Sequence, residues 1–117
     1  MRYWVFIPLL VIMDQVSKYF LEITRNTGAA FGILQGQNLF LILISLIALG
    51  FFILYYKKYQ IASMFVISGI IGNLIDRIFL GYVRDFIDLR FWPVFNLADS
   101  FMVVGIGLLV WIIFKKN

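Results

Sequence analysis

The apolar residues of this chain fall into four long stretches that are separated by short polar segments. The stretches cover roughly residues 3–21, 36–56, 60–80 and 94–114. A helix that crosses a bilayer needs about 20 mostly apolar residues, so each stretch is long enough to cross once. The pattern predicts an all-α membrane protein with four transmembrane helices. Residues 1–117 are expected to form a single integral membrane domain with a small polar segment outside the bilayer.

Composition supports lipid as the solvent of this chain. Of its 117 residues, 63% are apolar and 14% are charged, whereas a soluble domain is about 25% charged. Cysteine and histidine are both absent, which excludes disulfides, thiol nucleophiles and Cys/His zinc sites. Any chemistry must therefore use carboxylates, hydroxyls, amides or lysine. The isoelectric point is about 9.6, but the basic residues form no stripe, so no nucleic-acid partner is expected.

Charge along the chain predicts an orientation. With four spans, one side of the membrane carries five basic residues and no acid: Arg2, Lys57, Lys58, Lys115 and Lys116. The other side and the adjacent helix ends carry Lys18, Arg25, Arg77, Arg84 and Arg90, with the acids Asp14, Glu22, Asp76, Asp85, Asp88 and Asp99. The Lys and Arg count is tied, but the purely basic side suits the cytoplasmic leaflet. We therefore expect both termini in the cytoplasm and the polar segment to be extracytoplasmic.

The first helix contains the motif "DQVSK". Asp14 and Lys18 are four residues apart, so they share one helix face and can neutralise each other. A structural pair and a catalytic role are both compatible with this spacing. Ser17 and Lys18 could suggest a Ser–Lys protease dyad, but adjacent helical residues point about 100° apart, which argues against direct proton exchange.

Two further motifs combine amides with charges. In "RNTGAAFG", residues 25–32, Asn26 and Gly28 indicate either a turn or a backbone edge that binds substrate. In "GNLIDR", residues 72–77, Asn73 and Asp76 share a helix face with Arg77 adjacent. Such groups must face protein or a wet cavity, because exposure to lipid is costly. An ion-paired helix cap is the alternative to a functional site.

The polar stretch of residues 83–100, "VRDFIDLRFWPVFNLADS", leaves its conformation open. Asp85 and Asp88 would point to opposite faces of a strand but would share one face of a helix. Asn96 is well suited to cap the fourth helix, with Asp99 at the third position near the positive end of the helix dipole. Capping alone could explain both residues.

Small residues recur in the third and fourth predicted helices, where they favour close packing between helices. These residues are Gly69, Gly72, Gly105 and Gly107.

Several carboxylates are expected at one membrane depth, with no histidine, cysteine or metal-ligand set to take a catalytic role. Two close carboxylates resist simultaneous ionisation, so one keeps a proton while the other can activate water. This arrangement favours aspartic hydrolysis. The spacing and periodicity do not indicate which two acids are involved.

The motifs "DQVSK", "RNTGAAFG", "GNLIDR", "VRDFID" and "FNLADS" occur in this order over nearly the whole chain. The series closely resembles that of bacterial lipoprotein signal peptidase, also called signal peptidase II. The resemblance implies four helices in the bacterial cytoplasmic (inner) membrane, both termini in the cytoplasm and an active site at the outer face. It implies a catalytic pair, Asp85 and Asp99. It also implies substrate-binding or supporting residues, namely Asn26, Gly28, Asn73, Asp76, Arg77 and Asn96, and structural residues, namely Asp14 and Lys18.

The substrate implied by this resemblance is a prolipoprotein with a diacylglyceryl-modified cysteine, cut just before that cysteine. Its acyl chains would enter from the surrounding membrane lipid, and neither a cofactor nor a metal is needed. Inhibition by the cyclic peptide globomycin is also implied. The family's small outer sheet and covering loop have little sequence available here, because only residues 19–25 separate "SK" from "NTGAAFG".

A small four-helix multidrug or proton-coupled transporter is the principal alternative. Asp14 in the first helix and the tied charge count fit such a carrier. A carrier would not need five outer acids or the "NLADS" cap. A purely structural membrane subunit is the third and weakest alternative.

Overall fold

The computed structural model describes residues 2–21, 23–28 and 34–116, so Glu22 and residues 29–32 of the second motif lie outside the described residues. Four helices occupy the four apolar stretches, which confirms that part of the prediction. The elements are η1 (Tyr3–Val5), α1 (Phe6–Phe20), β1 (Thr24–Asn26), α2 (Asn38–Leu54), α3 (Gln60–Phe79), β2 (Val83–Asp85) and α4 (Leu97–Lys115).

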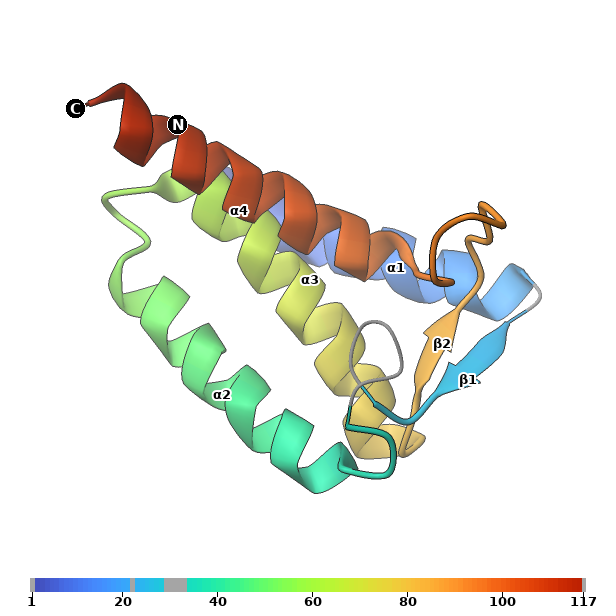
Figure 1. The fold of residues 1–117 in the computed structure, drawn as a ribbon. Coiled ribbons are helices and arrows are strands. Elements are labelled where there is room, and N and C mark those ends of the chain that lie inside the picture. Colours follow the sequence, from blue (N-terminus) through green and yellow to red (C-terminus); the bar gives the residue numbers. More distant parts are fainter. Residues whose placement is uncertain (1, 22, 29–33, 117) are drawn as a thin grey trace.

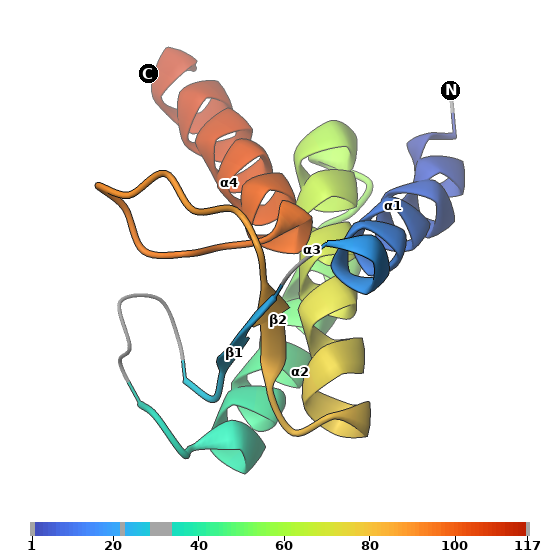
Figure 2. The same cartoon turned by 90° about the vertical axis from the view of Figure 1, so that its right-hand side faces the viewer.

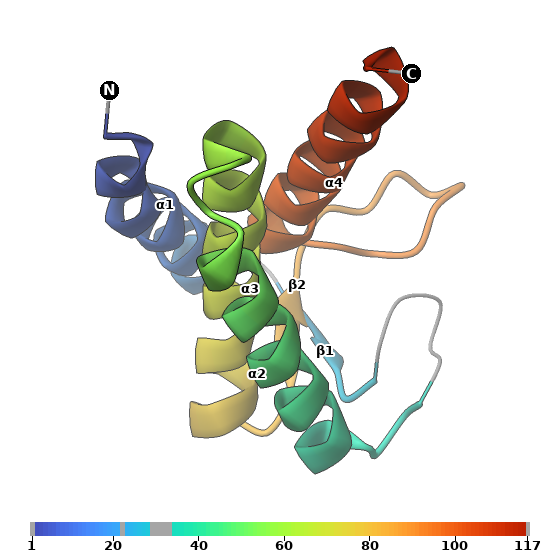
Figure 3. The same cartoon turned by 90° about the vertical axis from the view of Figure 1, so that its left-hand side faces the viewer.

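Helix α3 forms the centre of the fold. Helices α1, α2 and α4 each pack against it (Figure 1) and are arranged around it when the molecule is turned (Figures 2 and 3). Helices α3 and α4 approach each other closely, and a Cβ built on Gly69 would overlap the carbonyl oxygen of Ala98. A Cβ on Gly105 would lie 2.5 Å from Cγ2 of Val66. Glycine at these two positions therefore lets the helix backbones meet.

The predicted role of the four small residues holds for three of them. A Cβ on Gly72 would lie 2.5 Å from the Asp14 carboxylate, so this glycine makes room for a side chain of α1. Gly107 has no atom within 4 Å of the equivalent position among the described residues, so the packing role predicted for it is wrong. Its neighbour Ile106 is exposed as well, so these two residues lie on the outer face of α4, whereas Gly105 faces α3.

The distribution of polarity is inverted relative to a soluble protein. Large apolar side chains cover the outside of the helices, with exposures of 71% for Leu39, 74% for Ile47 and 73% for Phe114. Charged and amide groups are buried instead, among them Asp14, Lys18, Asp76, Asp85 and Asn96. An apolar exterior of this extent indicates a lipid environment. Within the described ranges, α3 and α4 are long and apolar enough to cross a membrane, and α2 is a shorter apolar helix.

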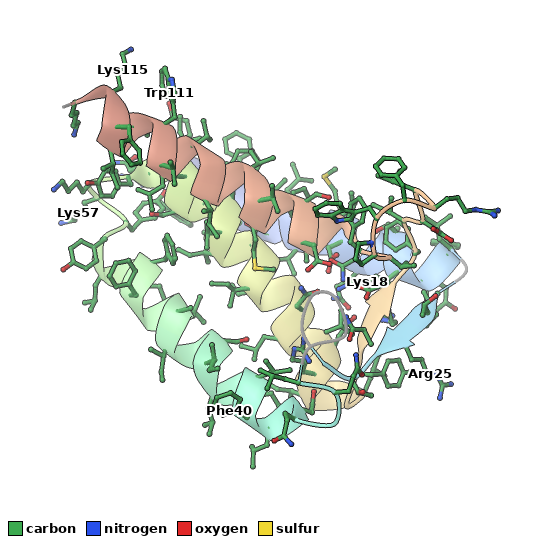
Figure 4. The ribbon with its side chains drawn as sticks, in the orientation of Figure 1. Lys18, Arg25, Phe40, Lys57, Trp111 and Lys115 are labelled. Carbon is green, nitrogen blue, oxygen red and sulfur yellow. The ribbon has the colours of Figure 1, made fainter. Side chains whose placement is uncertain are left out.

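The two ends of the molecule differ in chemistry. The chain termini and the connection between α2 and α3 lie at one end, and the two strands lie at the other (Figures 1 and 3). Lys57 and Lys115 belong to the first end (Figure 4). The basic groups that the sequence places on one side are therefore grouped by the fold.

A small sheet forms in the polar region, so the prediction of an all-α protein is wrong in this respect. Strands β1 and β2 pair antiparallel, with Arg25 opposite Arg84 and Asn26 opposite Val83. In β2, Val83 and Asp85 are buried and Arg84 is partly exposed, as expected for a strand. Asp88 lies beyond the strand and is exposed. Strands of three residues are too short to produce a readable alternation.

Candidate active site

A cavity of about 860 Å³ opens at the end of the molecule that carries the sheet. It lies between the strands, the loop of residues 86–95, the end of α3 and the first half of α4. Its polar lining includes six of the predicted site residues: Asn26, Gly28, Asn73, Arg77, Asp85 and Asp99. Its apolar lining includes Leu89, Phe91, Val103, Val104 and Ile106. The remaining predicted residues, Asp14, Lys18, Asp76 and Asn96, are buried behind the cavity.

The start of α4 places one carboxylate at this cavity. The Asn96 side-chain oxygen accepts from the Asp99 backbone N–H at 2.8 Å, and the Asp99 carboxylate accepts from the Asn96 N–H at 3.2 Å. This reciprocal capping box confirms the predicted cap. A third N–H of the first turn, that of Ala98, donates to Asp14 Oδ1 at 2.9 Å. The hydrogen bonds that begin α4 thus also hold the Asp99 carboxylate in place.

Two asparagine amides connect the carboxylates that line the cavity. Nδ2 of Asn96 donates to Asp85 Oδ1 at 2.9 Å and to Asn73 Oδ1 at 3.0 Å. Nδ2 of Asn73 donates to Asp99 Oδ1 at 2.9 Å. Asn26 on β1 donates to the second oxygen of Asp85 at 3.1 Å. Asp85 and Asp99 therefore face the same cavity and are held by one hydrogen-bonded set of amides.

The environment of Asp85 favours its protonated form. Burial, and to a lesser extent the nearby Asp99 carboxylate, raise the pKa of the Asp85 carboxyl from its ordinary value of 3.8 to about 6. The hydrogen bonds from Asn26 and Asn96 and the charge of Lys18 act in the opposite direction and are weaker. A carboxyl group with a pKa near 6 can both accept and donate a proton close to neutral pH.

A buried ion-pair cluster supports the cavity from behind. Nζ of Lys18 lies 2.7 Å from Asp14 Oδ2 and 3.1 Å from Asp76 Oδ2. Nη2 of Arg84 lies 2.8 Å from Asp76 Oδ1, and the Arg84 backbone N–H donates to Asp76 at 3.0 Å. The predicted pairing of Asp14 with Lys18 is confirmed. The cationic partner of Asp76 on the strand is Arg84, which the sequence pattern did not indicate.

Arg77, at the end of α3, bonds to the turn that follows β1. Its Nη2 donates to the carbonyl oxygen of Gly28 at 2.8 Å, and the Gly28 N–H donates to the side-chain oxygen of Asn26 at 2.9 Å. Asn38, at the start of α2, donates to the Arg77 carbonyl at 3.0 Å. Arg77 therefore joins the end of α3 to the turn after β1 and to α2, and it takes no part in the ion pairs of the described residues.

The contacts of Ser17 test the Ser–Lys dyad that the motif "DQVSK" could suggest. The Ser17 hydroxyl donates to the Asp14 carbonyl of its own helix at 2.8 Å, so it does not form a Ser–Lys dyad.

Gln15 is a member of the buried cluster that the sequence analysis did not identify. Its amide donates to Asp76 Oδ1 at 3.2 Å and accepts from Arg84 Nη2 at 2.7 Å. A polar residue within an apolar helix was the signal that could have identified Gln15.

Replacing Arg84 by methionine should destabilise the folded protein by about 3 kcal/mol, because Asp76 would keep a buried charge that is only partly compensated. Thermal unfolding in detergent measures this. Arg25 is the matched control, since it lies opposite Arg84 on β1, is exposed and stacks on the Tyr82 ring at 4.9 Å. Arg25→Met should cost less than about 1 kcal/mol. Equal losses in the two variants would contradict this account of the cluster.

Comparison with known proteins shows similarity over nearly the whole chain. A family model described as signal peptidase (SPase) II matches residues 6–115. The lipoprotein signal peptidase of Halothermothrix orenii is 43% identical over 105 residues, which cover 85% of this chain and 72% of the relative. That of Caldicellulosiruptor bescii is 36% identical over 140 residues, which cover 100% of this chain and 93% of the relative.

Solved structures show the same fold. A bacterial membrane enzyme determined by the in meso method at 2.3 Å resolution superposes with a TM-score of 0.91 at 32% identity, covering 97% of this chain and 88% of that one. A second, at 1.9 Å resolution, gives a TM-score of 0.86 at 29% identity, covering 98% and 94% of the two chains. The backbone arrangement that surrounds the cavity is therefore similar to that of both solved bacterial membrane enzymes.

Proposed function

Because the chain belongs to the signal peptidase II family, aspartic peptidases that remove signal peptides from prolipoproteins, we propose that Asp85 and Asp99 are its catalytic pair. The observation that carries this proposal is the joint placement of the two carboxylates at one cavity, linked through the amides of Asn73 and Asn96. Like charges held this way favour a state in which the pair keeps one proton.

In the proposed reaction, the ionised carboxylate takes a proton from a water molecule, and the water oxygen attacks the scissile carbonyl carbon. The protonated carboxyl donates its proton to the carbonyl oxygen, which gives a neutral tetrahedral intermediate. Collapse of that intermediate breaks the C–N bond: the leaving amine takes up a proton from one carboxyl of the pair, and a hydroxyl of the intermediate returns a proton to the other, so the pair again holds one proton. The products are a signal peptide with a new carboxylate and a mature chain with a new amino group.

The proposed substrate is a prolipoprotein whose cysteine carries diacylglycerol, cut just before that cysteine. Apolar side chains on α4, namely Val103, Val104 and Ile106, continue the cavity lining away from the carboxylates and offer a surface for acyl chains. Binding energy from this remote lipid would position the peptide bond at the carboxylates. Globomycin should inhibit by occupying the same cavity.

Cleavage of matched precursors tests the proposed specificity. Purified protein is given one precursor with diacylglyceryl-cysteine and the same precursor without the lipid. Only the modified precursor should be cut, and mass spectrometry should show lipidated cysteine as the first residue of the product. Equal cleavage of both precursors would refute the lipid requirement, and proton-driven dye efflux without proteolysis would favour a transporter.

We further propose that all four helices cross the bacterial cytoplasmic membrane, with both termini in the cytoplasm and the cavity at the outer face. The chain contains no native cysteine, so Arg25→Cys and Lys116→Cys can each report one side. An impermeant thiol reagent added outside spheroplasts should label the first variant only. Labelling of the second variant alone would mean the opposite orientation.

The pH dependence of cleavage follows from the pKa of Asp85. Because that pKa is raised to about 6, the proton held by the pair is lost as the pH rises through this value. The kcat/KM for cleavage should therefore fall by about tenfold for each pH unit above about 6. This fall is the alkaline limb of the pH profile. A profile that is flat from pH 5 to pH 8 would contradict the proposed use of this proton. The limb belongs to the coupled pair and not to one residue.

A further inference from the structure

Lys18 lies outside the cavity but makes a contact that reaches toward it. The residue is 2% exposed and points from α1 into the region where α3, α4 and β2 meet (Figure 4). Besides its two carboxylate partners, Nζ donates to Asn73 Oδ1 at 3.2 Å and to the Gly72 carbonyl at 3.4 Å. Ion pairing with Asp14 and Asp76 explains the burial of Lys18, but it does not explain the contact with Asn73.

The contact with Lys18 constrains the orientation of the Asn73 amide. An ammonium group has three donors and no acceptor, so the amide atom that faces it must be the oxygen. The NH2 group of Asn73 then points to Asp99, to which it donates at 2.9 Å. A flipped amide would place NH2 against both the ammonium and the Asn96 NH2 group, and it would place oxygen against the Asp99 carboxylate.

We propose that Lys18 is a positioning residue that acts through Asn73 to hold the Asp99 carboxylate in place for hydrolysis. This inference rests on the proposed catalytic role of Asp99. Asn96 also donates to Asn73 Oδ1, at 3.0 Å, but that donor lies on the same helix start as Asp99. Lys18 is the contact that ties the amide to α1, so it fixes Asn73 relative to the rest of the bundle.

The charge of Lys18 provides a second readout. The groups whose charge acts on Asp85 are Asp99 on α4, Arg77 on α3 and Lys18 on α1. Lys18 lowers the pKa of the Asp85 carboxyl, in opposition to burial and Asp99. Loss of the ammonium should therefore move the pH limb of kcat/KM to higher pH. The position of the limb thus reports whether the charge of Lys18 reaches the pair, and the change in kcat reports whether Lys18 positions Asp99.

The test compares two variants that differ only at residue 18. Asp14→Asn weakens the ion pair but keeps the Lys18 contact with Asn73, and the amide oxygen introduced at position 14 can still accept from the Ala98 N–H. Asp14→Asn/Lys18→Met removes the ammonium as well and leaves Asp76 paired with Arg84. Relative to Asp14→Asn, the double variant should lose about 10²-fold in kcat, the usual cost of displacing a catalytic group by about 1 Å. KM should change little, and the pH limb should shift upward.

Equal kcat values and equal limbs in the two variants would overturn the proposal, while cleavage by the unsubstituted protein would still support the proposed function. A mutant cycle adds a second test, because in an Asn73→Ala background the Lys18→Met change should cost nothing further in kcat. An undiminished loss in that background would overturn the route through Asn73.

If the double variant does not fold, neutron diffraction on the unsubstituted protein decides. Deuterons of Asn73 facing Asp99 support the proposal, and an oxygen facing Asp99 overturns it.

Discussion

Asp85→Asn and Asp99→Asn should each lower kcat/KM for a lipid-modified prolipoprotein by about 10⁴-fold, because each removes a group that must gain or lose a proton in every turnover. Asparagine keeps the shape of aspartate and can still accept one hydrogen bond. Position 85 would retain an acceptor for Asn96 or Asn26, and position 99 would retain one for Asn73 or the capping N–H. Cleavage of the modified precursor under matched enzyme concentrations measures the loss.

Asp88→Asn is the matched control for this pair. Asp88 is exposed, and its carboxylate accepts a local N–H, that of Arg90. Removal of its charge should leave kcat/KM within about twofold, since surface substitutions of this kind have small effects. Comparable losses in the Asp85, Asp99 and Asp88 variants would indicate a general electrostatic effect and would contradict the assignment of a specific pair.

The folded state should survive the Asp85 substitution, as the sign of its pKa shift shows. The folded pKa of about 6 lies above the ordinary value of 3.8, so the folded protein binds this proton more tightly than the unfolded chain. This tighter binding of the proton stabilises the folded state. The contribution is fully present below about pH 3.8 and is lost as the pH rises through about 6. At pH 8 the Asp85→Asn variant avoids the cost of a buried charge, which offsets its lost hydrogen bond of about 1 kcal/mol.

Gly69→Ala and Gly105→Ala should each destabilise the protein by about 3 kcal/mol or more, at the upper end of the usual cost of overpacking. The added methyl on residue 69 would overlap the Ala98 carbonyl oxygen. The methyl on residue 105 would lie 2.7 Å from the Ala62 carbonyl oxygen. Backbone atoms cannot rotate away as side chains can, so α3 and α4 would have to separate. Thermal unfolding in detergent should show a lower Tm for both variants.

The consequence should extend to activity. Asn73 on α3 donates to Asp99 on α4, so separation of these helices would break a contact between the proposed site residues. Gly107→Ala is the control, because its added methyl meets no atom within 4 Å of the described chain. It should be neutral or slightly stabilising, since alanine is the better helix former by about 1 kcal/mol. A Gly107 variant as unstable as the other two would show that the loss reflects helix flexibility and not contact.

Local patterns in the sequence predicted the features that depend on neighbouring residues. The four helices follow from apolar runs, the pair of Asp14 with Lys18 from a spacing of four, and the cap of α4 from Asn96 with Asp99 three residues later. Each of these interactions forms within one helix or its first turn. The geometry of these local interactions does not depend on the overall fold, so the amino-acid sequence was sufficient to predict them.

Contacts between distant segments were not predictable in the same way. The pairing of Arg84 with Asp76 depends on how β2 folds back along α3, and the bond from Arg77 to Gly28 depends on where β1 ends. Both arginines stand beside acids in the sequence, but their observed partners are distant in the chain. The choice of Asp85 and Asp99 among six acids came from resemblance to a known family, because helical and strand periodicity left it open.

Oxygen transfer tests the central claim most directly. A single turnover of the modified precursor is carried out in ¹⁸O-labelled water, and mass spectrometry then follows the label. If Asp85 and Asp99 activate water, the new carboxylate of the signal peptide carries one ¹⁸O and both aspartates remain unlabelled. Label in either aspartate, with an unlabelled peptide carboxylate, would mean direct attack by the enzyme and would contradict the account.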